Sequence, residues 1–264
     1  MINFNYEITD FSKENAHFLA QLSALSYENE ANITDALTTY FPGEFARFRF
    51  IDTDQDHKNA GFDAQAFAIA NQKAIFIVFR GTQEDSIEDL VSNMDNRLVP
   101  YNFGHIFKGF YDTLQVILTD IFATIKDFQD NKQLIYITGH SQGGALAMLA
   151  ARLLGEKMPE LNGVYTFGQP KIGDMLFATN FDMIFPTGVF RLVTTGDSVV
   201  DNPPSLYHAG ICVQLDENGN TEILQNSLLE TSSSDFSSVL DMLFDCATDG
   251  HQSHEILEYI KRLT

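Results

Sequence analysis

The chain has 264 residues, of which 44% are hydrophobic, enough to bury the core of one large α/β domain. We expect a single domain over residues 1–264, because the sequence has no Pro- or Gly-rich linker and no break in composition. The net charge of −20, from 36 acidic and 16 basic residues, excludes a basic patch that could neutralise phosphates, and so argues against nucleic-acid binding. The same charge disfavours docking on strongly anionic membranes.

Residues 1–7 contain neither the basic segment nor the apolar stretch of a secretion signal, so a cytoplasmic location is expected. The alternative is export without a cleavable signal, or the mature form of an exported enzyme. No run of about 18 apolar residues occurs, so no transmembrane segment is predicted. Cys212 and Cys246 lack the spacing of a metal site, and Cys212 is interpreted as a buried thiol. The oligomeric state is not predicted.

The predicted elements alternate between strands and helices along the chain. Ser12 is expected to cap a helix with Phe18, Leu19, Leu22 and Leu25 on one face, and residues 29–61 are predicted to be irregular. The later segments read as strands at 64–70, 74–79, 134–138, 164–167, 190–194 and 211–215, and as helices at 110–128, 144–154, after Asp174, and at 254–263. This alternation predicts an α/β fold with a mostly parallel, doubly wound sheet that begins with an antiparallel hairpin and has helices on both faces.

The most informative motif is Gly139-His140-Ser141-Gln142-Gly143. It follows the apolar strand at 134–138 and precedes the strong helix former at 144–154. Strand, tight turn and helix are the context of a nucleophile elbow, in which the turn lifts the hydroxyl of Ser141 above the sheet. The backbone amide of Gln142, at the helix N-terminus, is placed to donate to a developing oxyanion.

A nucleophilic serine needs a base, and that base needs an acid to orient it. On an α/β-hydrolase sheet these follow the serine in the order acid, then histidine. Asp197 is the favoured acid because it comes just after the C-terminal end of the strand at 190–194, where crevice residues of open sheets lie. Asp201 is the alternative, whereas Asp174 is better explained as a helix cap.

Three histidines follow Asp197. His208 introduces a strand-like segment and is interpreted as a structural or surface residue. His251 and His254 share the segment before the last helix, and position alone does not choose between them. Two close histidines suggest a metal, but no Cys, Asp and His cluster completes a ligand set, so no metal site is predicted.

A second oxyanion donor is expected after an earlier central strand. The strand at 74–79 leads into Arg80-Gly81-Thr82, where Gly81 permits a tight turn and Thr82 offers its amide and its hydroxyl. Each donor of this kind stabilises a transition state by about 3 kcal/mol.

The next segment is an amphipathic helix by its pattern, since apolar residues recur at helical spacing in Ile87, Leu90, Val91 and Met94. Two interpretations are open: a helix packed permanently on the core, or a lid within 83–105 that covers the serine and opens onto a lipid or ester surface. The acidic residues on its other face predict a neutral or zwitterionic interface.

These residues together resemble the class 3 lipases, the family of the filamentous-fungal triacylglycerol lipases and their bacterial and plant relatives. The resemblance covers residues 11–263 and is densest at 78–82, 109–110, 138–147, 166–174 and 191–204. It implies an α/β-hydrolase fold, no metal or organic cofactor, and hydrolysis of carboxylic esters, usually acylglycerols or phospholipid acyl chains.

Matched motif by motif, the resemblance implies that Ser141 is the nucleophile, Asp197 the orienting acid, and Thr82 with Gln142 the oxyanion hole. The histidine of the family stands just before a final helix, with a tyrosine about five residues later. His254 and Tyr259 fit this pattern and His251 does not. The chain departs from the family in Ser253, where Asp is common, in Phe107, where His is common, and in having no tryptophan at the lid.

The sequence therefore predicts a serine carboxylic-ester hydrolase, a lipase that cleaves acylglycerol-type esters through an acyl-enzyme on Ser141. The alternative enzymes are a phospholipase A1 and a soluble short-chain carboxylesterase with the same triad. A non-catalytic binding protein with the hydrolase fold is disfavoured, because the nucleophile, acid, base and oxyanion glycine are all present. The expected partners are a lipid or small ester substrate and, transiently, a neutral or zwitterionic lipid surface.

Overall fold

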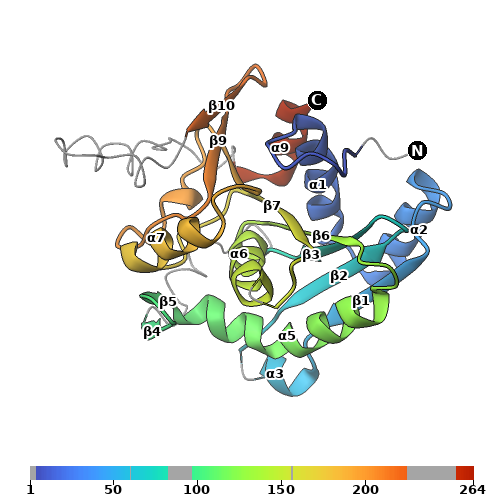
Figure 1. The fold of residues 1–264 in the computed structure, drawn as a ribbon, viewed down its shortest axis with the longest axis horizontal. Coiled ribbons are helices and arrows are strands. Elements are labelled where there is room, and N and C mark those ends of the chain that lie inside the picture. Colours follow the sequence, from blue (N-terminus) through green and yellow to red (C-terminus); the bar gives the residue numbers. More distant parts are fainter. Residues whose placement is uncertain (1–3, 60, 83–96, 156, 225–253) are drawn as a thin grey trace.

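The computed structural model describes residues 4–59, 61–82, 97–155, 157–224 and 254–264. Helices cover both faces of one eight-stranded sheet, whose strand order is β1-β2-β3-β6-β7-β8-β9-β10 (Figure 1). The strands of this sheet are β1 (Arg47–Asp52), β2 (Gln65–Ala70), β3 (Ala74–Phe79), β6 (Leu134–His140), β7 (Leu161–Phe167), β8 (Val189–Thr194), β9 (Ile211–Leu215) and β10 (Thr221–Leu224).

A separate two-stranded hairpin consists of β4 (Leu98–Pro100) and β5 (His105–Phe107). The helices are α1 (Lys13–Leu25), α2 (Glu30–Tyr40), α3 (Gln55–Asn59), α5 (Lys108–Phe128), α6 (Gln142–Gly155), α7 (Met175–Ile184) and α9 (Ile256–Leu263), with a short 3-10 turn at Val199–Asp201.

The central strands β3, β6, β7, β8 and β9 pair in parallel, while β1, β2 and β10 run antiparallel to their neighbours. The expected α/β fold with a mostly parallel sheet and an early antiparallel hairpin is therefore confirmed. Two predicted helix caps are also present. The Ser12 hydroxyl accepts from the Asn15 amide at 3.1 Å, and the Asp174 carboxylate accepts from the Phe177 amide at 2.9 Å.

The prediction of an irregular segment at 29–61 is wrong, because the segment contains α2, β1 and α3. The Asn29 side chain caps α2 by accepting from the Asn32 amide, and only Ile33 and Leu37, one turn apart, are buried on that helix. Strand β1 pairs antiparallel with β2 but is mostly half-exposed. Both elements therefore carry too little apolar periodicity to be seen in the sequence. Strand β10, which extends the sheet beyond β9, was also not predicted.

The two faces of the sheet have separate apolar cores, and alternate residues of each strand contribute to one or the other. On β3, Ile75, Ile77 and Phe79 pack in the core that also contains α5, α6 and α7. Phe76 and Val78 point to the opposite core, with α1, α2 and α9. All six residues of β3 are buried, as expected for a parallel strand covered on both faces.

Aromatic rings fill much of the core on the α1 and α9 side, and Phe76 is at their centre. Its ring centroid lies 5.1 Å from that of Phe4, 5.5 Å from Phe18 and 5.6 Å from Tyr136. The first two contacts are edge-to-face and the third is stacked. At these positions the phenylalanines fill the core.

The parallel register brings the ends of separate strands together. Residues that follow the C-terminal ends of β3, β6, β7 and β8 all lie at one edge of the sheet, where open α/β sheets place their ligands. Thr82, Ser141, Gly168 and Asp197 occupy these positions.

Truncation of Phe76 tests the importance of this core. We expect Phe76→Ala to lower the free energy of unfolding by about 3–5 kcal/mol, because the ring is fully buried among aromatic neighbours. The matched control is Phe103→Ala, whose ring is 61% exposed and whose loss should change stability by less than about 0.5 kcal/mol. Urea unfolding followed by circular dichroism measures both values, and similar values for the two variants would contradict the packing argument.

Candidate active site

Ser141 sits in the sharp turn between β6 and α6. Its φ angle is 55°, in the left-handed region that residues with a Cβ rarely adopt. The turn is closed by two backbone hydrogen bonds, from the Ser141 amide to the Phe167 carbonyl and from the Gly144 amide to the Ser141 carbonyl, both 2.9 Å. A strained residue held by its surroundings at this position is the geometry of a nucleophile elbow.

The glycines of the motif are required by close backbone contacts. A Cβ on Gly139 would lie 2.3 Å from the Gly143 carbonyl oxygen, and a Cβ on Gly143 would lie 2.4 Å from that of Phe79. Both distances are far below van der Waals contact, and in both cases the obstructing atom belongs to the backbone. The elbow can therefore bring α6 this close to β3 and β6 only with glycine at both positions.

His254 and Asp197 form a buried pair. Nδ1 of His254 lies 2.9 Å from each carboxylate oxygen of Asp197, and the two side chains are 5% and 0% exposed. The carboxylate also accepts hydrogen bonds from the Tyr259 hydroxyl at 2.6 Å and from the Val199 amide at 3.0 Å. Burial by itself raises the pKa of Asp197, but the hydrogen bonds and charge of His254 and the Tyr259 hydroxyl outweigh it, so the pKa is lowered overall.

The serine and the His254–Asp197 pair meet at the end of β7. The Ser141 amide is bonded to the Phe167 carbonyl, and a Cβ on the next residue, Gly168, would lie 2.8 Å from both Asp197 Oδ2 and His254 Nδ1. Ser141 Oγ and His254 Nε2 are both buried and have no hydrogen-bond partner among the described residues. In unliganded enzymes the hydrogen bond between a nucleophile and its base is often long, and it shortens when substrate binds.

The two expected oxyanion residues also lie together. The Thr82 hydroxyl donates to the side-chain carbonyl of Gln142 at 2.5 Å. Gln142 is the first residue of α6, and the first amides of a helix have no acceptor within it. The amide of Gln142 therefore suits an external acceptor next to Ser141.

His140 is buried directly before the nucleophile, and its hydrogen bonds define its tautomer. Nε2 lies 2.6 Å from the His254 carbonyl oxygen, which can only accept, so Nε2 carries the proton. Nδ1 then accepts from the Tyr27 hydroxyl at 2.7 Å. Burial and the neighbouring His254 lower the pKa of His140 to about 3, so the ring is neutral at pH 7.

The structure separates the sequence candidates. Both oxygens that face Nδ1 of His254 belong to Asp197, whereas Asp201, the alternative acid, lies in the 3-10 turn and has a pKa raised by burial. His208 is buried with Nε2 donating to the Val200 carbonyl at 2.8 Å, consistent with a structural residue. His251 and the four predicted lid residues Ile87, Leu90, Val91 and Met94 lie outside the described residues, as does Cys246.

Sequence reasoning missed the contacts of Tyr27, His140 and Gly168 at this site. For His140, the only signal was its place next to the serine. Tyr27 gave none, because it lies 114 positions before Ser141 along the chain. Gly168 follows the end of a predicted strand, a position that could have suggested a close approach.

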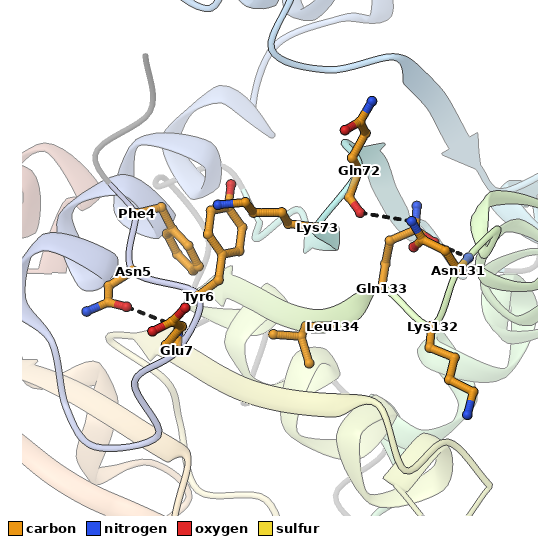
Figure 2. A pocket seen from close by; sticks show the side chains of 10 residues that line it. All are labelled: Phe4, Asn5, Tyr6, Glu7, Gln72, Lys73, Asn131, Lys132, Gln133 and Leu134. Atoms are coloured by element: carbon orange, nitrogen blue, oxygen red, sulfur yellow. Dashed lines mark hydrogen bonds between the residues drawn. The ribbon is translucent and has the colours of Figure 1, made fainter.

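A surface pocket lies at the opposite end of the sheet (Figure 2). It is lined by Phe4, Asn5, Tyr6, Glu7, Gln72, Lys73, Asn131, Lys132, Gln133 and Leu134. Lys73 and Leu134 stand at the N-terminal ends of β3 and β6, whereas Ser141 follows the C-terminal end of β6. The pocket is therefore separate from the candidate active site around Ser141.

The segment that contains most of the candidate active-site residues matches a known protein family. Residues 76–207, half of the chain, match the family model described as Lipase (class 3). The chain belongs to the class 3 lipase family. The matched segment of this lipase runs from β3 to the loop after the Val199–Asp201 turn, and so includes Thr82, Ser141, Gln142 and Asp197.

The relatives of this lipase include fungal enzymes. A lipase of Rhizomucor miehei is 29% identical over 253 residues, covering 84% of this chain and 68% of that protein. A lipase of Rhizopus niveus is 28% identical over 190 residues, covering 65% of this chain and 47% of that protein. A solved triacylglycerol lipase, described as having a serine protease triad as its catalytic centre, superimposes with a TM-score of 0.61 at 26% identity, covering 88% of this chain and 94% of that one. These findings confirm the expected lipase family and α/β-hydrolase fold.

Two further observations concern the described ranges alone. None of their helices is both long and apolar enough to cross a membrane. Nor do these ranges contain a group of three or more His, Cys, Asp or Glu side chains that could hold a metal ion. Cys212 is a buried thiol, as expected.

The buried neutral His140 predicts a pH dependence of stability. Its pKa is about 3 when folded and near 6.5 when exposed, so between these values the unfolded chain binds a proton that the folded protein does not. The stability of the wild type should therefore fall as pH decreases below 6.5. In His140→Gln this component is absent. As the pH is lowered from 6 to 4.5, the wild type should therefore lose about 1.4 kcal/mol of unfolding free energy per pH unit relative to the variant.

Urea unfolding at several pH values measures this difference. A difference that stays constant across the range would show that His140 takes up its proton in the folded protein as readily as in the unfolded chain.

Proposed function

We propose that this lipase hydrolyses acylglycerol-type esters through an acyl-enzyme on Ser141, with His254 as the base and Asp197 as the residue that orients it. The observation that carries the proposal is the buried His254–Asp197 pair beside the elbow serine. Nδ1 of His254 is bound to the carboxylate, which leaves Nε2 as its only basic atom. Ser141 Oγ and His254 Nε2 are the buried atoms without partners that the reaction needs.

The reaction follows from these atoms. Ser141 Oγ attacks the ester carbonyl carbon while His254 Nε2 takes the hydroxyl proton, and Asp197 stabilises the imidazolium that forms. The tetrahedral intermediate collapses, and His254 returns the proton to the leaving alcohol. A water molecule then attacks the acyl-enzyme with His254 again as the base, which releases the fatty acid and restores Ser141.

The environment of Asp197 keeps it ionised for this role. Its pKa is held low by hydrogen bonds from His254 and Tyr259, while burial and the nearby Asp197 charge raise the pKa of Tyr259 well above its ordinary value. Tyr259 therefore stays protonated and donates to the carboxylate at neutral pH. The negative charge that the imidazolium requires is in place before the proton moves.

The amides of Thr82 and Gln142 are the proposed oxyanion donors, and each would lower the barrier by about 3 kcal/mol. The hydrogen bond from the Thr82 hydroxyl to the Gln142 side chain joins the two residues that supply these amides. The bond restrains the loop after β3 relative to the start of α6, so the hole is partly formed before substrate binds.

The similarity to lipases, a triacylglycerol lipase among them, supports acylglycerols as the substrate class. The net charge of −20 favours a neutral or zwitterionic lipid surface over a strongly anionic one. A phospholipase A1 or a soluble short-chain esterase would use the same triad, and chain-length dependence of the rate separates them from an acylglycerol lipase.

Replacement of the nucleophile is the first test. We expect Ser141→Ala to remove hydrolysis of p-nitrophenyl esters by at least a factor of about 10⁴, because no hydroxyl remains to form the acyl-enzyme. Ser205→Ala, at an exposed serine, is the control and should retain the wild-type rate. Rates from acetate to palmitate, below and above substrate aggregation, assign the class. A rate that rises on aggregated long chains supports a lipase, and a rate confined to short soluble esters supports the esterase. A wild-type rate in Ser141→Ala would refute the proposed nucleophile.

The base is tested by comparing two histidines. His254→Ala should lower kcat by a factor of about 10³ or more, because it removes the proposed acceptor of the Ser141 proton. His251→Ala is the matched control, from the alternative that the sequence left open, and should retain most of the activity. Steady-state kinetics on p-nitrophenyl butyrate measures both. Loss of activity in the His251 variant alone would assign the base to His251.

A further inference from the structure

The hydroxyl of Tyr27 lies where two of the catalytic elements meet. Tyr27 follows α1, far from the catalytic residues in sequence, and its Oη is 2.7 Å from His140 Nδ1 on the elbow. A Cβ on Gly81 would lie only 2.2 Å from the same hydroxyl. Tyr27 is therefore in contact both with the residue before the nucleophile and with the loop that carries Thr82.

His140 continues this connection to the catalytic histidine. Its Nε2–H donates to the backbone carbonyl of His254 at 2.6 Å, and the two imidazole rings lie 4.7 Å apart with 35° between their planes. Because a carbonyl can only accept, the donor direction is fixed along the whole path, from Tyr27 to His140 and from His140 to His254.

The hydrogen bond from His140 restrains the backbone of His254 just before a helix. Helix α9 begins two residues later, and its N-cap residue, Glu255, makes no side-chain capping bond. The side chain of His254 is held by Asp197 through Nδ1, whereas its carbonyl is held by His140. Together these two bonds determine the direction in which Nε2 points.

We propose that Tyr27 and His140 are positioning residues for the catalytic histidine. The Tyr27 hydroxyl holds His140 in its Nε2–H tautomer, and His140 fixes the backbone of His254 so that Nε2 faces Ser141. This inference rests on the proposed function of Ser141 and His254. It assigns no proton transfer to Tyr27 or His140, because the hydrogen bonds of this path run from Tyr27 to His140 and from His140 to the His254 carbonyl.

A role in packing alone would predict a different result. Buried side chains that only fill space lower stability when truncated, and leave kcat of the folded fraction unchanged. A positioning role predicts a fall in kcat with KM nearly constant, because the base is displaced while the substrate site is intact. Displacements on the scale of 1 Å are enough to lower rates a hundred-fold.

The variants separate the two hydrogen bonds. Tyr27→Phe deletes only the hydroxyl and should lower kcat on p-nitrophenyl butyrate about ten-fold, with KM within about two-fold of the wild type. His140→Leu removes both bonds and should lower kcat about a hundred-fold. His140→Gln keeps an amide N–H near the position of Nε2 and should recover part of that loss.

Tyr136→Phe is the matched control. Tyr136 is a buried tyrosine on β6, the strand that also carries His140, and its hydroxyl donates to the Tyr6 carbonyl at 3.3 Å and accepts from Asn162 at 2.7 Å, near the opposite end of the strand. Its loss should lower thermal stability and leave kcat unchanged. In the double variant, Tyr27→Phe should cause no additional loss in a His140→Leu background, because Tyr27 acts through His140.

Proton NMR gives a readout that does not depend on ester hydrolysis. The Nδ1–H of His254, bonded to Asp197, should give a far-downfield resonance that is absent in His254→Gln. This resonance should shift or broaden in Tyr27→Phe and His140→Leu and stay in place in Tyr136→Phe. Displaced resonances in proteins that hydrolyse no tested ester would uphold the positioning role and refute the hydrolase function. Wild-type kcat and an unmoved resonance in both Tyr27→Phe and His140→Leu would overturn the positioning role.

Discussion

The buried negative charge of Asp197 is the constraint on which the candidate active site depends. An ionised carboxylate without solvent is strongly destabilising unless hydrogen bonds and opposite charge compensate it. Here the compensation comes from His254, from the Tyr259 hydroxyl and from the Val199 amide. His254 and Tyr259 belong to the segment 254–264 that contains α9, so the packing of this segment contributes to keeping the acid ionised.

The same end of the sheet shows how close backbone packing and chemistry are combined. Glycines at 81, 139, 143 and 168 each occupy a site where a Cβ would lie within 3 Å of a neighbouring atom. These contacts bring the ends of β3, β6 and β7 near enough for short side chains to meet. The strain of Ser141 in the left-handed region is maintained because backbone hydrogen bonds on both sides leave the turn no alternative.

The two ends of strand β6 have different surroundings. Strand β6 has Tyr136 near its beginning, stacked on Phe76 in an aromatic core, and His140 at its end, in a polar network. Most polar groups of that network are paired within it, as low-dielectric surroundings require. Ser141 Oγ and His254 Nε2 are exceptions, and they are the atoms between which the proposed reaction transfers a proton.

The sequence by itself determined the α/β class and the strand–turn–helix around Ser141, and it predicted Asp197 as the acid and Thr82 as an oxyanion residue. Each of these is a local pattern: an apolar strand, a glycine-bounded turn or a residue just past a strand end. The segment 29–61 was missed because α2 buries only two side chains and β1 is half-exposed, so neither shows strong periodicity. The sequence favoured Asp197 over Asp201, but only the folded protein shows that the Asp197 carboxylate contacts Nδ1 of His254. Tyr27 could be found only in three dimensions, because its hydroxyl reaches His140 across 113 residues of sequence. A contact of that kind leaves no periodic signal, since the sheet register and the packing of α1 alone bring the two side chains together.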